Sequence, residues 1–304
     1  MSDNGRVPRP LPADLSPRLP SPLTEIDDDR FARHGVRILL KRDDLIHPDL
    51  IGNKWRKLAP NLEAAGDRPL VTFGGAYSNH LRATAAAGRL LGIPTTGIVR
   101  GDELAGRPLN PSLTRCAEDG MRLRFVDRST YRHKDDPATL TALLEAADAQ
   151  DAYVVPEGGS NALAVRGCVA LGRELRGRAD VVAVPCGTGG TLAGLAAGLC
   201  DDQRALGVAV LKGGFLTSEV RALQEAAFGD VRGDWQVADG FHFGGYARVP
   251  AELRAFADDF GQRHGLAVEH LYVAKMLHAL VELTRSGAFP TGTTIAAVVT
   301  GTPR

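Results

Sequence analysis

The stretch "DVVAVPCGTGGTLAGLAAGL", Asp180–Leu199, decides the fold class that this sequence predicts. It begins as an apolar strand, turns through closely spaced glycines, and continues as a helical segment rich in Ala, Gly and Leu. A strand that passes through a glycine turn into a helix is the repeating unit of folds in which helices cover a parallel sheet. The stretch therefore predicts one strand–helix unit of an α/β protein.

The same order of elements extends toward the N-terminus. Strands are expected within 36–45, 69–75, 94–101, 121–127 and 152–159. Helices are expected to begin at Asn53 and near residues 79, 110, 136 and 161. This alternation predicts an α/β fold of open, twisted parallel sheets with helices on both faces. In such folds ligands bind beyond the carboxyl ends of the strands.

Length and charge narrow the class of function. The chain has 304 residues, 44% of them hydrophobic, so it can form a sizeable core and is expected to have two domains or lobes. Its 36 Lys and Arg residues balance 36 Asp and Glu residues. This balance offers no field that attracts nucleic acid or an anionic membrane, so we expect a small-molecule protein.

The N-terminus and the cysteines indicate where the protein works. Residues 1–23 are polar and Pro-rich and lack the apolar core of a signal peptide, and no apolar run approaches the roughly 20 residues of a membrane span. The cysteines form no CxxC pair, so neither a zinc site nor a disulfide framework is expected, and no metal is predicted. Buried, reduced thiols fit a cytoplasmic protein. The cysteines are Cys116, Cys168, Cys186 and Cys200.

The segment "IGNKWRKL", Ile51–Leu58, poses a problem of charge. Asn53 is a good helix N-cap, and apolar residues follow it at helical spacing. Lys54, Arg56 and Lys57 then crowd the positive end of the helix dipole, where each cation costs about 0.3–1 kcal/mol. Either Arg56 and Lys57 extend into water at small cost, or the dipole lowers the pKa of a lysine that acts as a nucleophile.

Three loops between strands and helices carry candidate ligand-binding residues. In "CGTGGT", Cys186–Thr191, converging backbone N–H groups and a helix N-terminus can hold a phosphate, although the glycines could also serve a tight turn alone. The loop matches neither the dinucleotide fingerprint, because Leu192 replaces its last glycine, nor the P-loop. "GGAYSNH", Gly74–His80, and "PEGGSN", Pro156–Asn161, offer polar side chains that either face a ligand or cap a helix.

Single aromatic and histidine residues are ambiguous by themselves. His80 could be an ordinary residue of a helix terminus, and Tyr246 and Tyr272 could be core aromatics that need only a hydrogen-bond partner. Together the features are more specific. A lysine at a helix start, a phosphate cradle far along the chain and polar loops between them suit a phosphorylated aldehyde cofactor, and pyridoxal 5'-phosphate fits that description.

The motifs also resemble those of a known family. "LLKRDDL", "GNKWRKL", "TFGGAYSNH", "PEGGSNALAVRG", "GTGGTLAGL", "HFGGY", "LYVAKM" and "VVTG" follow one another between Leu39 and Gly301. In this order they resemble the family of D-cysteine desulfhydrases and 1-aminocyclopropane-1-carboxylate deaminases. The resemblance implies the fold of the tryptophan synthase β subunit, with the cofactor between two domains. A larger phosphate-binding domain is expected at 1–53 and 162–304, and a smaller inserted α/β domain at 54–161.

The resemblance also implies roles for individual residues. Lys54 would form the Schiff base with the cofactor, Asn79 would bond its phenolic oxygen, and Thr300 would lie near its pyridine nitrogen. Ser78 would face the substrate, with Tyr246 and Tyr272 as active-site tyrosines. The residues that would hold the phosphate are Gly187, Thr188, Gly189, Gly190 and Thr191.

Departures from the family pattern bear on the substrate. Histidine at 80 is typical of desulfhydrases, whereas deaminases have glutamine there. Deaminases carry glutamate and leucine where this chain has Val273 and Thr300. A neutral hydroxyl at Thr300 should leave the ring nitrogen unprotonated, which suits elimination of a good leaving group better than opening of a cyclopropane ring. Valine matches neither group.

The favoured interpretation is therefore a pyridoxal-phosphate lyase that acts on D-cysteine or a similar β-substituted amino acid. Lys54 would remove the α-proton, and the products would be a keto acid and ammonia. A 1-aminocyclopropane-1-carboxylate deaminase and a non-catalytic pyridoxal-phosphate-binding protein remain alternatives, and a nicotinamide dehydrogenase lacks the fingerprint glycine at Leu192. Relatives suggest a homodimer.

Overall fold

A computed structural model describes residues 15–50, 52–245 and 247–302. The predicted site residue Tyr246 and residues 1–14 of the Pro-rich lead lie outside the described residues. The described chain forms two compact units. Residues 18–46, 52–57 and 160–302 belong to the larger unit, and residues 15–17, 47–50 and 58–159 belong to the smaller one.

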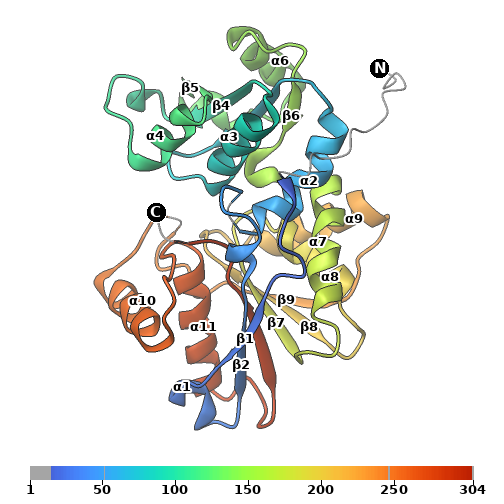
Figure 1. The fold of residues 1–304 in the computed structure, drawn as a ribbon, viewed down its shortest axis with the longest axis vertical. Helices are drawn as coiled ribbons and strands as arrows, with labels where there is room; N and C mark the ends of the chain where they lie inside the picture. Colours follow the sequence, from blue (N-terminus) through green and yellow to red (C-terminus); the bar gives the residue numbers. More distant parts are fainter. Residues whose placement is uncertain (1–14, 51, 246, 303–304) are drawn as a thin grey trace. The chain divides into compact units, whose positions relative to one another are not determined.

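The larger unit contains a six-stranded sheet in the order β1-β2-β10-β7-β8-β9 (Figure 1). Its strands are β1 (Leu23–Ile26), β2 (Arg37–Lys41), β7 (Val181–Cys186), β8 (Arg204–Ala209), β9 (Asp234–Ala238) and β10 (Thr294–Val298). From β2 to β9 the pairing is parallel, as predicted, whereas β1 pairs antiparallel with β2 at one edge. The predicted fold class is confirmed, and β1 is an addition that the alternation of strands and helices did not reveal.

Helices cover both faces of this sheet because successive strand residues point to opposite sides. Ile295 and Ala297 of β10 pack in one core with residues of α1, α10 and α11, while Ala296 and Val298 pack in a second core with α7, α8 and α9 (Figure 1). These helices are α1 (Asp29–Ala32), α7 (Ala162–Glu174), α8 (Gly190–Gly198), α9 (Leu216–Phe228), α10 (Ala251–His264) and α11 (Val273–Arg285). The short 3-10 helix η2 (Asp43–Leu45) follows β2, and α2 (Lys54–Ala65) runs from the larger unit into the smaller one.

The smaller unit has a parallel four-stranded sheet in the order β5-β4-β3-β6. Its strands are β3 (Leu70–Gly74), β4 (Thr95–Arg100), β5 (Arg122–Val126) and β6 (Tyr153–Val155). Ile98 of β4 packs with residues of α5 and α6 on one face, and its neighbour Val99 packs with α3 and α4 on the other. The helical elements are α3 (Asn79–Leu91), η3 (Asp102–Leu104), α4 (Pro111–Glu118), α5 (Arg128–Arg132), α6 (Pro137–Ala146) and η4 (Glu157–Gly159).

The helix boundaries in this unit follow from local sequence. The Ser78 hydroxyl caps α3 by accepting from the Leu81 N–H at 3.3 Å, and Gly92, with φ of 67°, ends that helix in the left-handed conformation. Asn110 caps α4, and Pro111 occupies its first turn, where no N–H is needed. The predicted starts of both helices are therefore confirmed.

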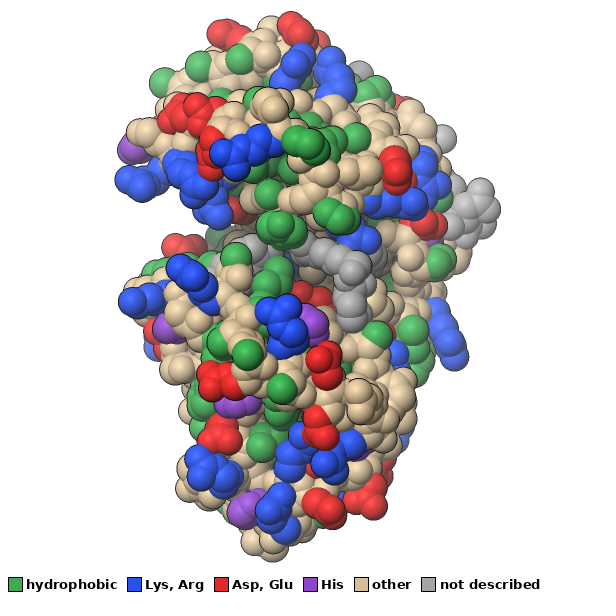
Figure 2. Space-filling model, turned by 90° about the vertical axis from the view of Figure 1, so that its left-hand side faces the viewer, with side chains coloured by type: hydrophobic (Ala, Val, Ile, Leu, Met, Phe, Trp, Pro, Cys, Tyr) green, Lys and Arg blue, Asp and Glu red, His purple; other side chains and the backbone are tan. Residues whose placement is uncertain are grey.

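The surface fits the balanced composition. On the face in Figure 2, Lys and Arg side chains are interspersed with Asp and Glu over both units. No helix in residues 15–302, with 51 and 246 set aside, combines the length and the apolar composition that a membrane crossing requires.

Arg56 does not extend into water, which corrects one of the two interpretations of the helix start. Its side chain is buried, with Nε donating to Asp43 at 2.8 Å and Nη1 donating to Glu174 at 2.8 Å. Lys41 Nζ adds a second cation 2.6 Å from Glu174. Burial opposes the charged guanidinium, yet the two carboxylates outweigh it and raise the pKa of Arg56 above its ordinary value. This network fixes the start of α2 against η2 and α7.

We predict that Arg56→Ala destabilises the protein by about 3–5 kcal/mol, because it leaves the fully buried Asp43 carboxylate without its cation. Urea unfolding followed by circular dichroism measures the change. The exposed pair Arg37–Glu25, at 2.8 Å, is the matched control, and Arg37→Ala should change stability little. Equal effects of the two substitutions would contradict a structural role for the buried network.

Candidate active site

Lys54 is the first residue of α2 and lies in the larger unit. Two residues earlier, Gly52 has φ of 66°, and a Cβ there would lie 1.8 Å from the carbonyl oxygen of Thr300. Only glycine permits so close an approach. The backbone that leads into Lys54 therefore runs directly against Thr300, which follows β10 at the carboxyl edge of the larger sheet.

Asn53 ties the same segment to the predicted phosphate loop. Its side-chain amide donates to Thr191 Oγ1 at 2.8 Å, although the two residues are 138 positions apart. The structure thus brings together Lys54, Thr300 and the loop Gly187–Thr191. Sequence reasoning treated Asn53 as a helix cap and did not find this contact.

The loop from Gly187 to Thr191 connects β7 to α8. Gly189 has φ of 78°, and a Cβ on it would lie 2.7 Å from Val220 Cγ2, so glycine is required for packing as well as for conformation. A Cβ on Gly190 would lie 2.6 Å from Ser160 Oγ and 3.3 Å from Lys57 Nζ. Gly190 therefore keeps open a space that an amine, a hydroxyl and the N-terminus of α8 surround.

Lys57 and Ser160 lie at the phosphate loop, although the sequence did not single out either of them as a phosphate-binding residue. Lys57 is buried, and its Nζ donates to Ser160 Oγ at 2.6 Å; Ser160 Oγ lies in turn 2.6 Å from Thr188 Oγ1. Lys57 is also three residues after Lys54, so the two amines share a helix face. That spacing could have identified Lys57 as a second amine at the loop.

The amines of Lys54 and Lys57 both have lowered pKa values, and the main cause is burial. Burial lowers the pKa of Lys54 to about 8, although part of the side-chain surface is accessible. Burial also lowers the pKa of Lys57 well below its ordinary value, and the nearby charge of Lys54 lowers it further. A lowered lysine pKa was predicted, but desolvation causes it, whereas the sequence suggested the helix dipole.

Tyr272 borders the same loop. It precedes α11, and a Cβ on Gly187 would lie 3.4 Å from both Cε1 and Oη of its ring. The buried carboxylate of Glu269 holds this helix start by accepting from the N–H groups of Tyr272, at 2.7 Å, and Val273, at 3.3 Å. The Val273 side chain is fully buried in the core of the larger unit.

Although Tyr246 lies outside the described residues, the loop before it is well anchored. Lys275 Nζ donates to the carbonyl oxygens of His242 at 3.0 Å and Gly245 at 2.7 Å. The chain from 242 to 245 is thereby attached to α11, the helix that Tyr272 precedes.

The remaining predicted residues, Ser78 and Asn79, start α3 in the smaller unit. Ser78 has the capping role that the sequence allowed. His80 is buried, and its Nε2 lies 2.7 Å from Thr72 Oγ1, which donates to the Val155 carbonyl oxygen. Because the Thr72 proton is engaged there, Nε2 acts as the donor. His80 thus attaches the start of α3 to β3, and Thr72 in turn links β3 to β6, as expected of an ordinary structural histidine.

The chain is similar to known proteins along most of its length. The model of the family described as "Pyridoxal-phosphate dependent enzyme" matches residues 17–301. A candidate 1-aminocyclopropane-1-carboxylate deaminase of Pyrococcus horikoshii is 30% identical over 276 residues, with 83% of this chain and 81% of the relative covered. The bifunctional mitochondrial D-cysteine desulfhydrase/1-aminocyclopropane-1-carboxylate deaminase of Arabidopsis thaliana is 28% identical over 305 residues, covering 88% and 73%.

A solved structure of a homologue of 1-aminocyclopropane-1-carboxylate deaminase superimposes with a TM-score of 0.79 and 28% identity, covering 92% of this chain and 89% of that one. This chain belongs to the family of pyridoxal-phosphate dependent enzymes. The predicted resemblance, fold and cofactor are therefore confirmed.

The residues present fit that cofactor. Its phosphate needs several donors in a space without side chains, and the structure offers the N-terminus of α8 and the open space at Gly190. Further donors at this loop are the buried amine of Lys57 and the hydroxyl groups of Ser160 and Thr188. Its aldehyde needs a lysine that loses its proton readily, and Lys54 supplies one.

We predict that Gly190→Ala weakens binding of pyridoxal phosphate at least about tenfold, because the new methyl group fills the space beside Ser160 and Lys57. Fluorescence titration of the apoenzyme gives the Kd. Gly240→Ala, where a Cβ meets nothing within 4 Å, is the control and should bind normally. Unchanged affinity of the Gly190 variant would show that the loop serves only as a turn.

We also predict a distinctive pH dependence for loading of the apoenzyme with the cofactor. Below a pKa of about 8 Lys54 is protonated and unreactive, so the rate of loading should rise with pH and level off above about 8. An ordinary lysine would continue to gain reactivity toward about 10.4. Absorbance kinetics measure the rate, with Nα-acetyl-lysine correcting for titration of the cofactor. A rate that still climbs steeply at pH values well above 8 would contradict the lowered pKa.

Proposed function

We propose that this protein is a lyase that eliminates a β-substituent from a small amino acid, with D-cysteine or a close analogue as substrate. The observation that carries the proposal is the joining of Lys54, the loop Gly187–Thr191 and Thr300 through Asn53 and Gly52. The named activities of the Arabidopsis relative, on D-cysteine and on 1-aminocyclopropane-1-carboxylate, define the substrates to compare.

Pyridoxal phosphate, when bound, supplies the electron-withdrawing system that acidifies the α-proton of an amino acid. The chain supplies the positioning and the proton transfer. Lys57, Ser160, Thr188 and the N-terminus of α8 would hold the phosphate. The Lys54 amine, with a pKa of about 8, is matched to accepting the α-proton near neutral pH.

We assign further roles on the basis of the family resemblance. Thr191 would assist at the phosphate, and its hydroxyl is already oriented by Asn53. Asn79 would bond the phenolic oxygen, Ser78 would face the substrate, and Tyr246 and Tyr272 would complete the substrate site. The position of the Tyr272 ring beside Gly187 supports its part in this assignment.

The choice of elimination over ring opening rests on two side chains. Thr300 presents a neutral hydroxyl, which would leave the pyridine nitrogen largely unprotonated, and elimination of sulfide needs less electron withdrawal than opening a cyclopropane ring. Val273 carries no acid, and it is packed in the core beside the buried Glu269. A glutamate at 273 would place a second carboxylate in that buried region, at a large desolvation cost.

Deaminase activity is the second candidate, because the superimposed structure, 28% identical, is that of a homologue of 1-aminocyclopropane-1-carboxylate deaminase. We further propose the domain roles given by the resemblance, with phosphate binding by the larger domain and a smaller inserted domain beside it. Of the expected bounds, 1–53 and 162–304 for the larger domain and 54–161 for the smaller, we replace the start and the end of the smaller domain, because residues 52–57 and 160–161 belong to the larger compact unit. A cytoplasmic homodimer is part of the same proposal, and light scattering after size-exclusion chromatography tests the dimer.

We predict that the purified enzyme converts D-cysteine and water to pyruvate, ammonia and sulfide faster than it forms 2-oxobutyrate from 1-aminocyclopropane-1-carboxylate. Coupled assays of sulfide and keto acid measure both reactions, with L-cysteine and β-chloro-D-alanine included. Efficient ring opening without turnover of D-cysteine would make the deaminase the correct assignment, and turnover of neither would favour the non-catalytic alternative.

Lys54→Ala is the control for chemistry, since it should abolish turnover while the phosphate loop still retains the cofactor noncovalently. Borohydride reduction followed by peptide mapping should find the cofactor fixed to Lys54 in the unmodified enzyme. Fixation to Lys41 or Lys57 would contradict the role of Lys54.

A further inference from the structure

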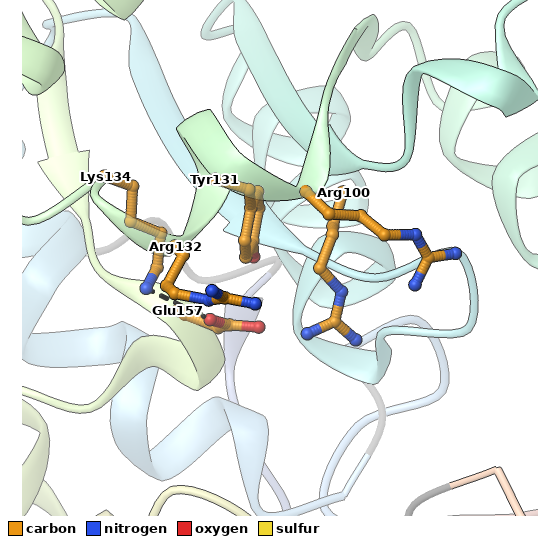
Figure 3. A pocket seen from close by; sticks show the side chains of 6 residues that line it. Arg100, Tyr131, Arg132, Lys134 and Glu157 are labelled. Atoms are coloured by element: carbon orange, nitrogen blue, oxygen red, sulfur yellow. Dashed lines mark ion pairs between the residues drawn. The ribbon is translucent and has the colours of Figure 1, made fainter.

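A second pocket, which the proposed function does not use, lies at the carboxyl edge of the smaller sheet. It has a volume of about 340 Å³, and its walls come from the end of β4, from α5 and the turn after it, and from η4 after β6 (Figure 3). Ligands of α/β sheets bind at this edge. The lining residues are Arg100, Arg128, Tyr131, Arg132, Lys134 and Glu157.

The pocket carries more positive than negative charge. Its six lining residues include four cations and one carboxylate. Glu157 pairs with Lys134 at 3.4 Å, and Arg128 pairs with Glu103 outside the pocket. Within the part of the chain that the structure describes, no carboxylate lies at ion-pair distance from Arg100 or Arg132. Two guanidinium groups at one small cavity are therefore left without a counterion.

The floor of the pocket is a tyrosine whose hydroxyl lacks a well-aligned acceptor. The Tyr131 side chain is only 3% exposed, because its ring packs edge-on against Phe73 at 6.3 Å. The Lys134 ammonium and the Arg100 guanidinium lie 5.2 and 5.6 Å from the centre of its ring. No described residue meets its buried hydroxyl with full hydrogen-bond geometry, and the Glu157 carboxylate lies near enough to act only as a weak acceptor. A buried donor of this kind costs about 1–3 kcal/mol unless a bound group accepts from it.

Tyr131 remains a donor at neutral pH. Burial raises the pKa of its phenol above the ordinary range, and the charge of the nearby Glu157 raises it further. Figure 3 shows the side chains of Tyr131, Arg132, Lys134 and Glu157 converging on the cavity from these elements.

We propose that this pocket binds a compact dianion, the phosphate group of a small molecule. Phosphate oxygens would accept from the Tyr131 hydroxyl on the floor and from the guanidinium groups of Arg100 and Arg132 on the rim. The planar donor fork of a guanidinium group matches the geometry of phosphate oxygens. Two negative charges balance the two uncompensated cations. The cavity leaves room beyond a phosphate for an organic part, and Glu157 can accept from a hydroxyl on it. This site lies wholly in the smaller unit and does not rest on the proposed function.

Isothermal titration calorimetry of the cofactor-loaded enzyme tests the proposal, because the loaded cofactor occupies the other phosphate site. Inorganic phosphate and glycerol 3-phosphate are titrated at constant ionic strength set with chloride. We expect saturable binding at one site per chain. Arg132→Gln and Tyr131→Phe should each weaken it about tenfold or more, since each removes a donor to a charged group. Tighter binding of the ester would identify a phosphorylated metabolite as the ligand, and equal binding would identify free phosphate.

Arg122→Gln is the matched control, because Arg122 is an exposed arginine of β5 in the same unit but outside the pocket. It should bind phosphate as the unmodified enzyme does. Absence of saturable binding would overturn the proposal, as would normal binding by both pocket variants. An equal loss of phosphate affinity in Arg122→Gln would also overturn it, because the binding would then depend on overall surface charge and not on the pocket. Arg132 is exposed, so its variant is expected to fold even if Tyr131→Phe does not.

Discussion

The structure of the larger unit depends on the burial of cations at the start of α2. The side chains of Arg56 and Lys57 are buried in the protein interior. Lys54, in the same helical turn, is partly accessible, but burial still lowers its pKa. The interior accommodates them in two different ways. Arg56 keeps its charge because the Asp43 and Glu174 carboxylates pair with it. The Lys57 amine instead donates to the Ser160 hydroxyl, and burial lowers its pKa well below the ordinary value.

Within four residues, Arg56 is therefore a permanently charged structural cation, whereas the amines of Lys54 and Lys57 can lose a proton. Guanidinium groups cannot lose a proton in a protein, so a buried arginine requires carboxylates, and here these come from η2 and α7. An ammonium group can lose its proton when desolvated, and that property is what a nucleophile and general base requires. The ion network around Arg56 thus fixes the helix that carries Lys54, the amine that we propose as the nucleophile.

The glycines of the site complete this arrangement. Gly52 admits the Thr300 carbonyl oxygen, and Gly190 leaves space among Ser160 and Lys57. In both places the absence of a side chain allows segments distant in sequence to approach one another. The smaller unit carries a separate pocket lined mainly by Arg and Lys side chains.

The sequence by itself determined the alternation of strands and helices, the starts of the helices near residues 79 and 110, and the pairing of a lysine motif with a glycine loop, because each depends on local spacing and backbone preference. It also identified the family, because the motifs between Leu39 and Gly301 follow one another in the order found in that family. The tertiary structure alone decided that Arg56 and Lys57 are buried, that Asn53 contacts Thr191, and that Val273 belongs to the core. These depend on which residues 100 or more positions away pack against α2 or α11, and no local pattern encodes the desolvation that lowers the pKa of Lys54.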